Sequence, residues 1–409
     1  MKIWQGFIEG LKKIKRNLAA VVKNARASLY LKKNKFKVPT NEIIKVGFYI
    51  DFPQGWDKLS PIYKCMKENE FFFPQVIVDK KTGHEQIKAL EHVDFSETGE
   101  VIFNDGLLNI KELEYDYFFY QRPYNSFYPS ELNVSKVVKY TNICYLPYGY
   151  AGSDVFNSGN TNSEFFRYVY LGFIEIGEER RILNEKFKVN CQKGYQYFEN
   201  HGYPAFEKYL DYKSSGIYSH ILWTPRWALG EIGGSHFLEY KDEFLKLNEV
   251  FPNAQITFRP HPLMFGNFIS KGLMTKNEVE EYKNKMLSNG IMQSSNDSVE
   301  DDFDSTDILL TDYSSIMIQY FLTGKPIVYC PAEYELNEEY KRILDGVYVA
   351  NSWQDAVDIM KKLLDGKDIL KEKREAIIKQ YFTDVKGSSK RIVTRIYDDY
   401  MERKNLFRR

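Results

Sequence analysis

An acidic side chain and several hydroxyls separate two apolar runs in ILLTDYSSIMIQYFLTGKPIVYC, residues 308–330. The first run predicts a strand, so Thr311, Asp312, Ser314 and Ser315 fall where that strand ends and a helix begins. Unpaired amides and the helix dipole make such a helix start a binding place for phosphate. We expect Ser314 to cap the helix, Ser314 and Ser315 to donate to a diphosphate, and Asp312 to orient them. The alternative is a plain cap beside a structural Asp.

A second polar group follows the strand candidate QITF, in FRPHP at residues 258–262. Arg259 offers a planar fork for phosphate oxygens, and His261 lies between two prolines that fix the backbone. A rigid histidine at a strand end suits stabilisation of a leaving phosphate, as a hydrogen-bond donor or as a general acid.

A third group follows the strand candidate that ends in WTPRW, residues 223–227, and continues in GGSHF, residues 233–237. Gly234 allows close approach of the backbone to a ligand, and Ser235 is placed to cap a helix that starts near Phe237. Arg226 and His236 are further polar candidates. Each motif is common alone, so the prediction of a phosphate site depends on three strand ends of one domain meeting at one sheet edge.

Two series of apolar strands alternate with helices and predict an α/β protein with two doubly wound, Rossmann-like domains that face a cleft. The first domain spans 43–215 and the second 216–385, and a helix at 386–409 could return to the first domain. The predicted strands lie at residues 43–51, 74–79, 99–104, 115–121, 137–149, 218–227, 255–260, 306–312, 325–330 and 346–350. The predicted helices of the second domain lie at 237–250, 276–287, 315–322, 352–364 and 370–381.

Residues 1–42 form a basic segment in a chain whose formal net charge is zero. Apolar residues recur between its lysines and arginines at helical spacing, which is typical of an amphipathic helix on an anionic membrane surface. The segment is too polar to span a bilayer. The alternative is a helix that is solvated or packed on its own domain. Zero net charge gives no reason to expect a nucleic-acid partner. Four scattered cysteines predict neither disulfides nor structural zinc, and favour a cytoplasmic location.

FRPHP, followed roughly fifty residues later by DILLTDYSSIMIQYFLTGKPIVYC, resembles the signature of the CDP-glycerol glycerophosphotransferase family, which makes teichoic acids and related polymers. The resemblance covers about residues 218–334. It implies a GT-B fold whose C-terminal half binds a CDP-activated donor. It also implies that His261 contacts the donor diphosphate and that Ser314 and Ser315 contact its phosphates, with Thr311 and Asp312 close by.

Two departures from the family pattern concern the acceptor and the donor sugar. Members commonly carry a His-Gly pair as the presumed general base, but CYLPYGYAGSD at 144–154 has Tyr148 before Gly149. A tyrosine with its ordinary pKa of about 10 is a poor base at neutral pH. We expect Asp154, Asp51 or His236 to take the proton, or the acceptor to differ. The second departure follows GKP at 324–326, where RILDGVYV keeps the family's later block only loosely.

The sequence therefore predicts a phosphotransferase on the inner face of the cell membrane. It would move glycerol phosphate, or a related polyol phosphate, from a CDP-activated donor to a hydroxyl of a lipid-linked or glycan acceptor and release CMP. We expect no cofactor and no tightly bound metal in the donor site. Two alternatives remain: a GT-B glycosyltransferase that uses a nucleotide sugar, and a non-catalytic nucleotide-binding scaffold.

Overall fold

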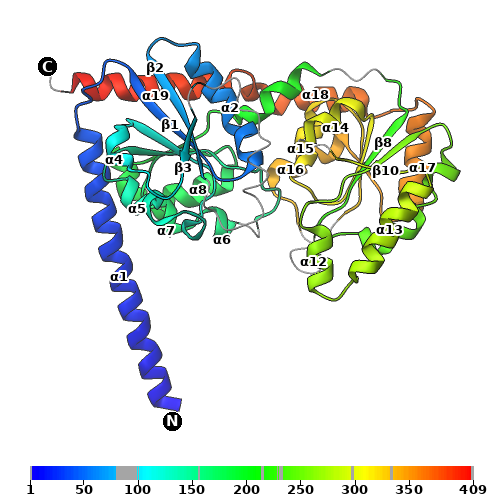
Figure 1. Cartoon of the computed structure of the whole chain (residues 1–409), viewed down its shortest axis with the longest axis horizontal. Coiled ribbons are helices and arrows are strands. Elements are labelled where there is room, and N and C mark those ends of the chain that lie inside the picture. Colours follow the sequence, from blue (N-terminus) through cyan, green and yellow to red (C-terminus); the bar gives the residue numbers. More distant parts are fainter. Residues whose placement is uncertain are drawn as a thin grey trace. The chain divides into compact units, whose positions relative to one another are not determined.

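The structure is a computed structural model that describes residues 2–79, 99, 101–154, 157–212, 216–227, 229, 234–295, 299–331 and 335–406 (Figure 1). The chain divides into two compact units. Unit 1 comprises Met1–Tyr148, Asn157–Ala205 and Gly387–Arg409, and unit 2 comprises Gly149–Phe156 and Phe206–Lys386. A short segment from the middle of the first half of the chain therefore belongs to unit 2.

Unit 1 contains a seven-stranded sheet of order β3-β2-β1-β4-β5-β6-β7, in which every described pair is parallel. Its central strands β1, β4, β5 and β6 are almost wholly buried and largely apolar, as expected for a parallel sheet covered on both faces. The sequence analysis did not predict β6 and β7. The strands are β1 Ile44–Ile50, β2 Phe72–Asp79, β3 Val101–Asn104, β4 Tyr117–Tyr120, β5 Asn142–Tyr145, β6 Val169–Phe173 and β7 Tyr197–Glu199.

The described helices of unit 1 vary widely in length. They are α1 Lys2–Phe36, α2 Pro53–Lys67, α4 Ile110–Leu113, α5 Val134–Val137, α6 Asn157–Asn160, α7 Ser163–Phe166, α8 Gly177–Lys186, α9 Lys188–Gln192 and α19 Ser388–Asn405. The C-terminal helix α19 packs on α2, and so belongs to the first unit although it comes last in the chain.

Unit 2 contains a six-stranded parallel sheet of order β10-β9-β8-β11-β12-β13. All its strands except β10 match predicted strands. The strands are β8 His220–Thr224, β9 Gln255–Phe258, β10 Met292–Gln293, β11 Ile308–Thr311, β12 Ile327–Tyr329 and β13 Tyr348–Val349. The described helices are α10 Phe237–Phe244, α11 Leu247–Val250, α12 Met264–Ser270, α13 Lys276–Ser288, α14 Val299–Ser305, α15 Ile316–Leu322, α16 Glu338–Lys341, α17 Trp353–Leu364 and α18 Lys371–Tyr381.

Aromatic packing fixes the strand ends of unit 2. Trp223, in β8, is fully buried, and its ring lies 4.2 Å from Phe244, 5.4 Å from Phe258 and 5.8 Å from Phe237 between centroids. Such a cluster excludes water and holds β8, β9 and α10 in one arrangement. The polar residues that follow these strands are thus positioned by a rigid core.

Each sheet has one topological switch point, the place where the strand order reverses direction. In unit 1 it lies between β1 and β4, and in unit 2 between β8 and β11. Ligands of open α/β sheets bind beyond the carboxyl ends of the strands at such points. These two sheet edges are therefore the first places to search for a site.

Helix α1 is joined to unit 1 through its C-terminal part. Ala27 and Leu31 are fully buried, and the Asn34 side chain donates to the backbone oxygens of Val138 and Thr141 at 2.7 and 3.2 Å. Further toward the N-terminus, Leu18 is 64% exposed. Among the described residues, no helix combines the length and the apolar character needed to cross a membrane.

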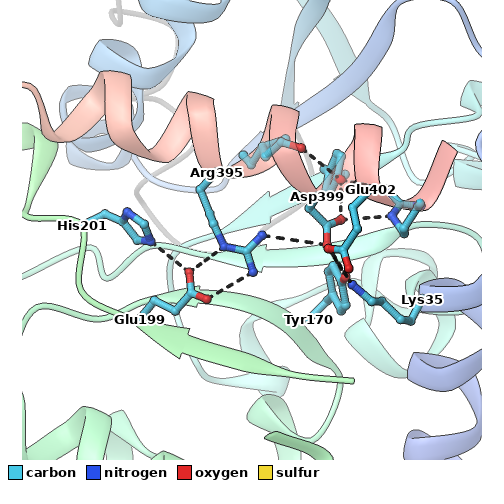
Figure 2. Close-up of polar contacts among 10 residues, drawn as sticks. Lys35, Tyr170, Glu199, His201, Arg395, Asp399 and Glu402 are labelled. Atoms are coloured by element: carbon cyan, nitrogen blue, oxygen red, sulfur yellow. Dashed lines mark hydrogen bonds and ion pairs between the residues drawn. The ribbon is translucent and has the colours of Figure 1, made fainter. Parts of the chain in front are cut away.

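A buried carboxylate, Asp399 of α19, ties both ends of the chain to the sheet (Figure 2). It accepts hydrogen bonds from Tyr117 at 2.6 Å, from Tyr170, and from Arg403 at 3.0 Å, and the Lys35 ammonium of α1 lies 3.6 Å away. Burial alone would raise its pKa, but Arg403 and the two tyrosines outweigh burial and lower the pKa of Asp399. The carboxylate therefore stays charged and fully partnered.

Candidate active site

Asp312 organises the switch point of unit 2. It follows β11 directly and is fully buried. Its Oδ2 accepts hydrogen bonds from the backbone amides of Arg226, at 3.0 Å, and His236, at 3.2 Å. Its Oδ1 has no partner in the described part of the chain. Asp312 therefore holds the loops that follow β8 in place at the end of β11.

Burial raises the pKa of Asp312 from 3.8 to about 6, against the opposing effects of His236, the two backbone amides and Arg226. The group is therefore mostly a carboxylate at neutral pH and titrates just below it.

His236 is held at both ring nitrogens. Nδ1 lies 3.0 Å from a carboxylate oxygen of Glu239, Nε2 lies 2.9 Å from the backbone oxygen of Pro331, and the ring stacks on Tyr240 with centroids 5.0 Å apart. Burial alone would lower the pKa of His236, but the bonds to Glu239 and Pro331 outweigh it and raise that pKa. Both partners are acceptors, so both ring nitrogens are engaged, and the protonated ring, which donates to both, has no free lone pair. This geometry disfavours the general-base role predicted for His236.

Thr311 requires a correction. Its side chain is fully buried, and its hydroxyl donates to the backbone oxygen of Thr224 at 3.1 Å and accepts from the Thr224 hydroxyl at 2.9 Å. These bonds join neighbouring strands inside the sheet. Thr311 therefore stabilises the sheet. Its side chain is not presented to a donor, although the sequence predicted that Thr311 lies in the donor site.

The helix that follows β11 starts one residue later than predicted, with Ser315 at the N-cap position. The hydroxyl of Ser314 accepts from the amide of Ile316 at 3.4 Å, which is a long bond. Ser315 is exposed and Ser314 half-buried. Both serines thus lie at the sheet edge, and their contact with a phosphate stays a prediction.

His261 presents one ring nitrogen as a donor. Its Nδ1 accepts from the backbone amide of Leu263 at 3.1 Å, so in the neutral ring the proton is on Nε2. Within the described ranges, Nε2 has no hydrogen-bond partner. Desolvation by the surrounding protein lowers the pKa of His261, and the charge of Arg226 lowers it further. A neutral Nε2–H suits a hydrogen bond to a phosphate oxygen.

The two predicted arginines differ in their partners. The Arg226 guanidinium lies 4.4 Å over the ring of Tyr313 and donates to the Tyr313 backbone oxygen at 3.3 Å. Arg259 instead donates to a carboxylate oxygen of Asp302 at 2.6 Å and to the Ser294 hydroxyl at 3.0 Å. A phosphate would compete with Asp302 for Arg259. Arg226 is therefore the better placed of the two, and donor binding by Arg259 stays a prediction.

The predicted turn before α10 is present. Gly234 has a φ of 77°, in the left-handed region that favours glycine, and the Ser235 hydroxyl accepts from the amide of Phe237 at 3.3 Å. Contact of Gly234 and Ser235 with the donor stays a prediction.

One feature of the site has no local sequence signal: the segment 150–154 docks on the DYSS motif, inside unit 2. The amide of Gly152 donates to the Tyr313 hydroxyl at 2.7 Å. The Tyr340 hydroxyl contacts the backbone oxygens of Tyr150, at 3.1 Å, and Ser315, at 3.3 Å. One tyrosine oxygen thus touches both the segment and the start of α15.

The docking is close because residue 152 is a glycine. A Cβ at this position would lie 2.6 Å from the Tyr313 ring and 2.7 Å from the Tyr340 ring. Asp154, one of the candidate bases, is exposed two residues later. Its segment is therefore fastened to the unit that carries His261 and Asp312.

Asp51, another candidate base, lies in unit 1 at the end of β1. It is buried, and its Oδ2 accepts from Arg122 Nε at 2.9 Å and from a second guanidinium nitrogen. Burial raises the pKa of Asp51, and Arg122 opposes the shift. Outside the gaps in the described chain, no three His, Cys, Asp or Glu side chains are arranged to hold a metal ion.

Residues 210–398 match the family model described as CDP-glycerol:poly(glycerophosphate) glycerophosphotransferase. The predicted resemblance is confirmed. The match covers unit 2 almost entirely and includes every motif of the predicted donor site. It also confirms the predicted enzyme class, a CDP-glycerol glycerophosphotransferase. No curated protein is similar enough in sequence to count as a relative.

Solved structures similar to the chain include two kinds of protein. A variant of the wall teichoic acid polymerase TagF soaked with CDPG is 18% identical, with a TM-score of 0.53 over 97% of this chain and 98% of its own. A UDP-GlcNAc 2-epimerase from Neisseria meningitidis bound to UDP-GlcNAc is 12% identical, with a TM-score of 0.55 over 87% and 100%. At such identities the likeness shows the fold, and it confirms the predicted GT-B class.

Proposed function

We propose that the protein transfers glycerol phosphate from CDP-glycerol to a hydroxyl of a lipid-linked or glycan acceptor, in the synthesis of a teichoic-acid-like polymer, and releases CMP. The observation that carries the proposal is the neutral His261 near Arg226, at the strand ends that Asp312 organises, inside the matched region. A related polyol phosphate would fit the same residues.

In the proposed reaction the acceptor hydroxyl attacks the phosphorus that bears glycerol, and the bond from this phosphorus to the bridging oxygen breaks. Negative charge grows on the phosphate oxygens and on the departing CMP. His261 would donate its Nε2 proton in a hydrogen bond to one of these oxygens, while Arg226 supplies positive charge. Their main contribution is positioning and electrostatic stabilisation.

Asp154 is the base that we propose. Both ring nitrogens of His236 are engaged, and the carboxylate of Asp51 is already engaged by Arg122. Asp154 is exposed, and its segment is bonded to Tyr313 through Gly152.

The central test is CMP release from CDP-glycerol with teichoic-acid-bearing membranes as the acceptor source. We expect His261→Ala to lower the rate at least about a hundredfold, since a donor to the developing charge is typically worth that much. His201→Ala, in unit 1, is the matched control, because the His201 ring bonds the Glu199 carboxylate at 2.9 Å and is not among the predicted site residues. Release of a nucleoside diphosphate from a nucleotide sugar would favour a glycosyltransferase, and an unchanged His261→Ala rate would favour a scaffold.

We also propose that α1 holds the protein on the inner face of the membrane. Residues 1–37 are rich in lysine and arginine, and the apolar side chains of Leu18, Val21 and Val22 are each at least 60% exposed. Removing residues 2–22, which include the exposed apolar residues, should lower flotation with anionic vesicles several-fold at low salt. The packed residues Ala27 and Leu31 remain in this variant. Neutral vesicles are the control, and unchanged flotation would contradict the proposal.

A further inference from the structure

The switch point of unit 1 carries a polar group that no activity described above uses. Gln121 follows β4 directly and is 2% exposed, yet within the described chain neither its amide nitrogen nor its amide oxygen has a hydrogen-bond partner. Leaving a buried polar group unsatisfied destabilises the folded protein. Gln121 lies at the sheet edge where ligands of such folds bind. Its unsatisfied amide therefore indicates that a bound ligand supplies the missing hydrogen bonds.

The neighbouring ion pair reaches the surface and is electrically neutral. Arg122 bonds Asp51 through Nε at 2.9 Å, and its guanidinium lies between the rings of Phe52, at 4.9 Å, and Phe127, at 4.5 Å. Its Nη1 has no hydrogen-bond partner in the part of the chain that is described, and 11% of the side chain is exposed. The edge therefore offers donors to a ligand without a net positive charge.

The amide of Gln121 lies against the first turn of α2. A Cβ on Gly55 would be 2.4 Å from the Gln121 oxygen and 3.0 Å from the Phe52 ring. The N-cap residue of α2, Phe52, provides no side-chain hydrogen bond to this turn. The Tyr148 ring, 37% exposed, packs edge-on against Phe52 at 5.7 Å. Aromatic faces and an unsatisfied amide thus meet at one place.

We propose that this edge binds the neutral, hydroxyl-bearing end of the acceptor, a polyol, through the Gln121 amide. A hydroxyl both donates and accepts, so one or two hydroxyls satisfy both amide atoms. A phosphodiester carries no proton at neutral pH, so it only accepts and would leave the Gln121 oxygen without a donor. The Asp51 carboxylate also cancels the charge that would attract it. The Phe52 ring would move to admit the ligand. The assignment rests on the proposed function, in which a hydroxyl is the nucleophile.

The decisive variant is Gln121→Leu. If the amide serves a ligand, Gln121→Leu should raise the Tm of the free protein, because it removes an unsatisfied polar group. The same variant should raise the KM for the acceptor at least about tenfold and leave the Kd for CDP-glycerol unchanged. Gln121→Met, close to isosteric, guards against a packing defect. The matched control is Gln196→Leu, which should lower the Tm, because the buried Gln196 amide donates to Phe166 and Val169.

A ligand-binding experiment tests this site independently of the proposed catalytic activity. Glycerophosphoglycerol, which has neutral polyol ends, should raise the Tm of the native protein but not of Gln121→Leu, even if CMP release were absent. A Tm shift with inorganic phosphate and none with this probe would overturn the assignment to a neutral polyol. An acceptor KM unchanged in Gln121→Leu and Gln121→Met would overturn the site.

Discussion

The two switch points share a topology but treat their carboxylates differently. In unit 2, Oδ2 of Asp312 accepts from two backbone amides, and the guanidinium of Arg226 lies over the Tyr313 ring. In unit 1, Asp51 is satisfied by the guanidinium of Arg122, and the charges cancel. Under the two proposals, the partner of the buried carboxylate decides whether each sheet edge binds an anionic diphosphate or a neutral hydroxyl.

The largest effect should come from Asp312→Leu, which tests the comparison from the unit 2 side. Leucine offers no acceptor to the backbone N–H groups of Arg226 and His236, so the loops would be released, and we expect the Kd for CDP-glycerol to rise about a hundredfold. Calorimetric titration measures it. Asp51→Asn should cost stability in unit 1 but leave this Kd unchanged, and an equal loss in both variants would contradict the distinction.

The same carboxylate gives the donor site a pH dependence. Since the pKa of Asp312 is about 6, donor affinity should weaken as the pH falls through that value. The sign for stability is the opposite: burial raises this pKa above its unfolded value of 3.8, so the contribution of Asp312 to stability is full below about pH 4 and is lost as the pH rises through 6. The Kd inflection should be absent from Asp312→Asn.

A smaller effect is expected from Tyr313→Phe, which tests how the segment 150–154 is held in unit 2. The change removes the acceptor of the Gly152 amide, so the segment that carries Asp154 should shift while the donor loops stay in place. We expect kcat to fall about tenfold with little change in the KM for CDP-glycerol, at a stability cost of about 1 kcal/mol.

Tyr348→Phe is the control for that variant. The Tyr348 hydroxyl donates to Asp368 at 2.9 Å, so its loss tests stability without touching the segment. A rise in donor KM with unchanged kcat for Tyr313→Phe would place the tyrosine in donor binding instead.

Most of the fold was predictable because parallel strands leave long apolar runs in the sequence. The predicted strand at 43–51 corresponds to β1, Ile44–Ile50, and the predicted helix at 352–364 to α17, Trp353–Leu364. The missed strand β6 contains Gly172, which weakens a strand pattern. In the structure this glycine lets Phe198 of β7 pack closely, since a Cβ there would lie 2.6 Å from its ring.

The sites were less predictable, because function there depends on where side chains point and on contacts between distant residues. Thr311 and Asp312 are neighbours in one motif, yet one bonds the sheet and the other the loops. Gly152 and Tyr313 are far apart in the sequence, and no local pattern links them. For Gln121 the signal is an unsatisfied amide, which only three-dimensional packing reveals.

The Asp399 cluster makes the stability of the protein depend on residues near both termini. Lys35, near the start of the chain, forms an ion pair with Asp399 (Figure 2). Arg403, near the end of the chain, forms an ion pair with the same carboxylate. Removing residues 1–35 would take away Lys35, and removing residues 403–409 would take away Arg403, so either truncation removes a positive charge from beside this buried carboxylate. The two terminal segments are held by one shared carboxylate, so the stability of a variant shortened at either terminus should be measured.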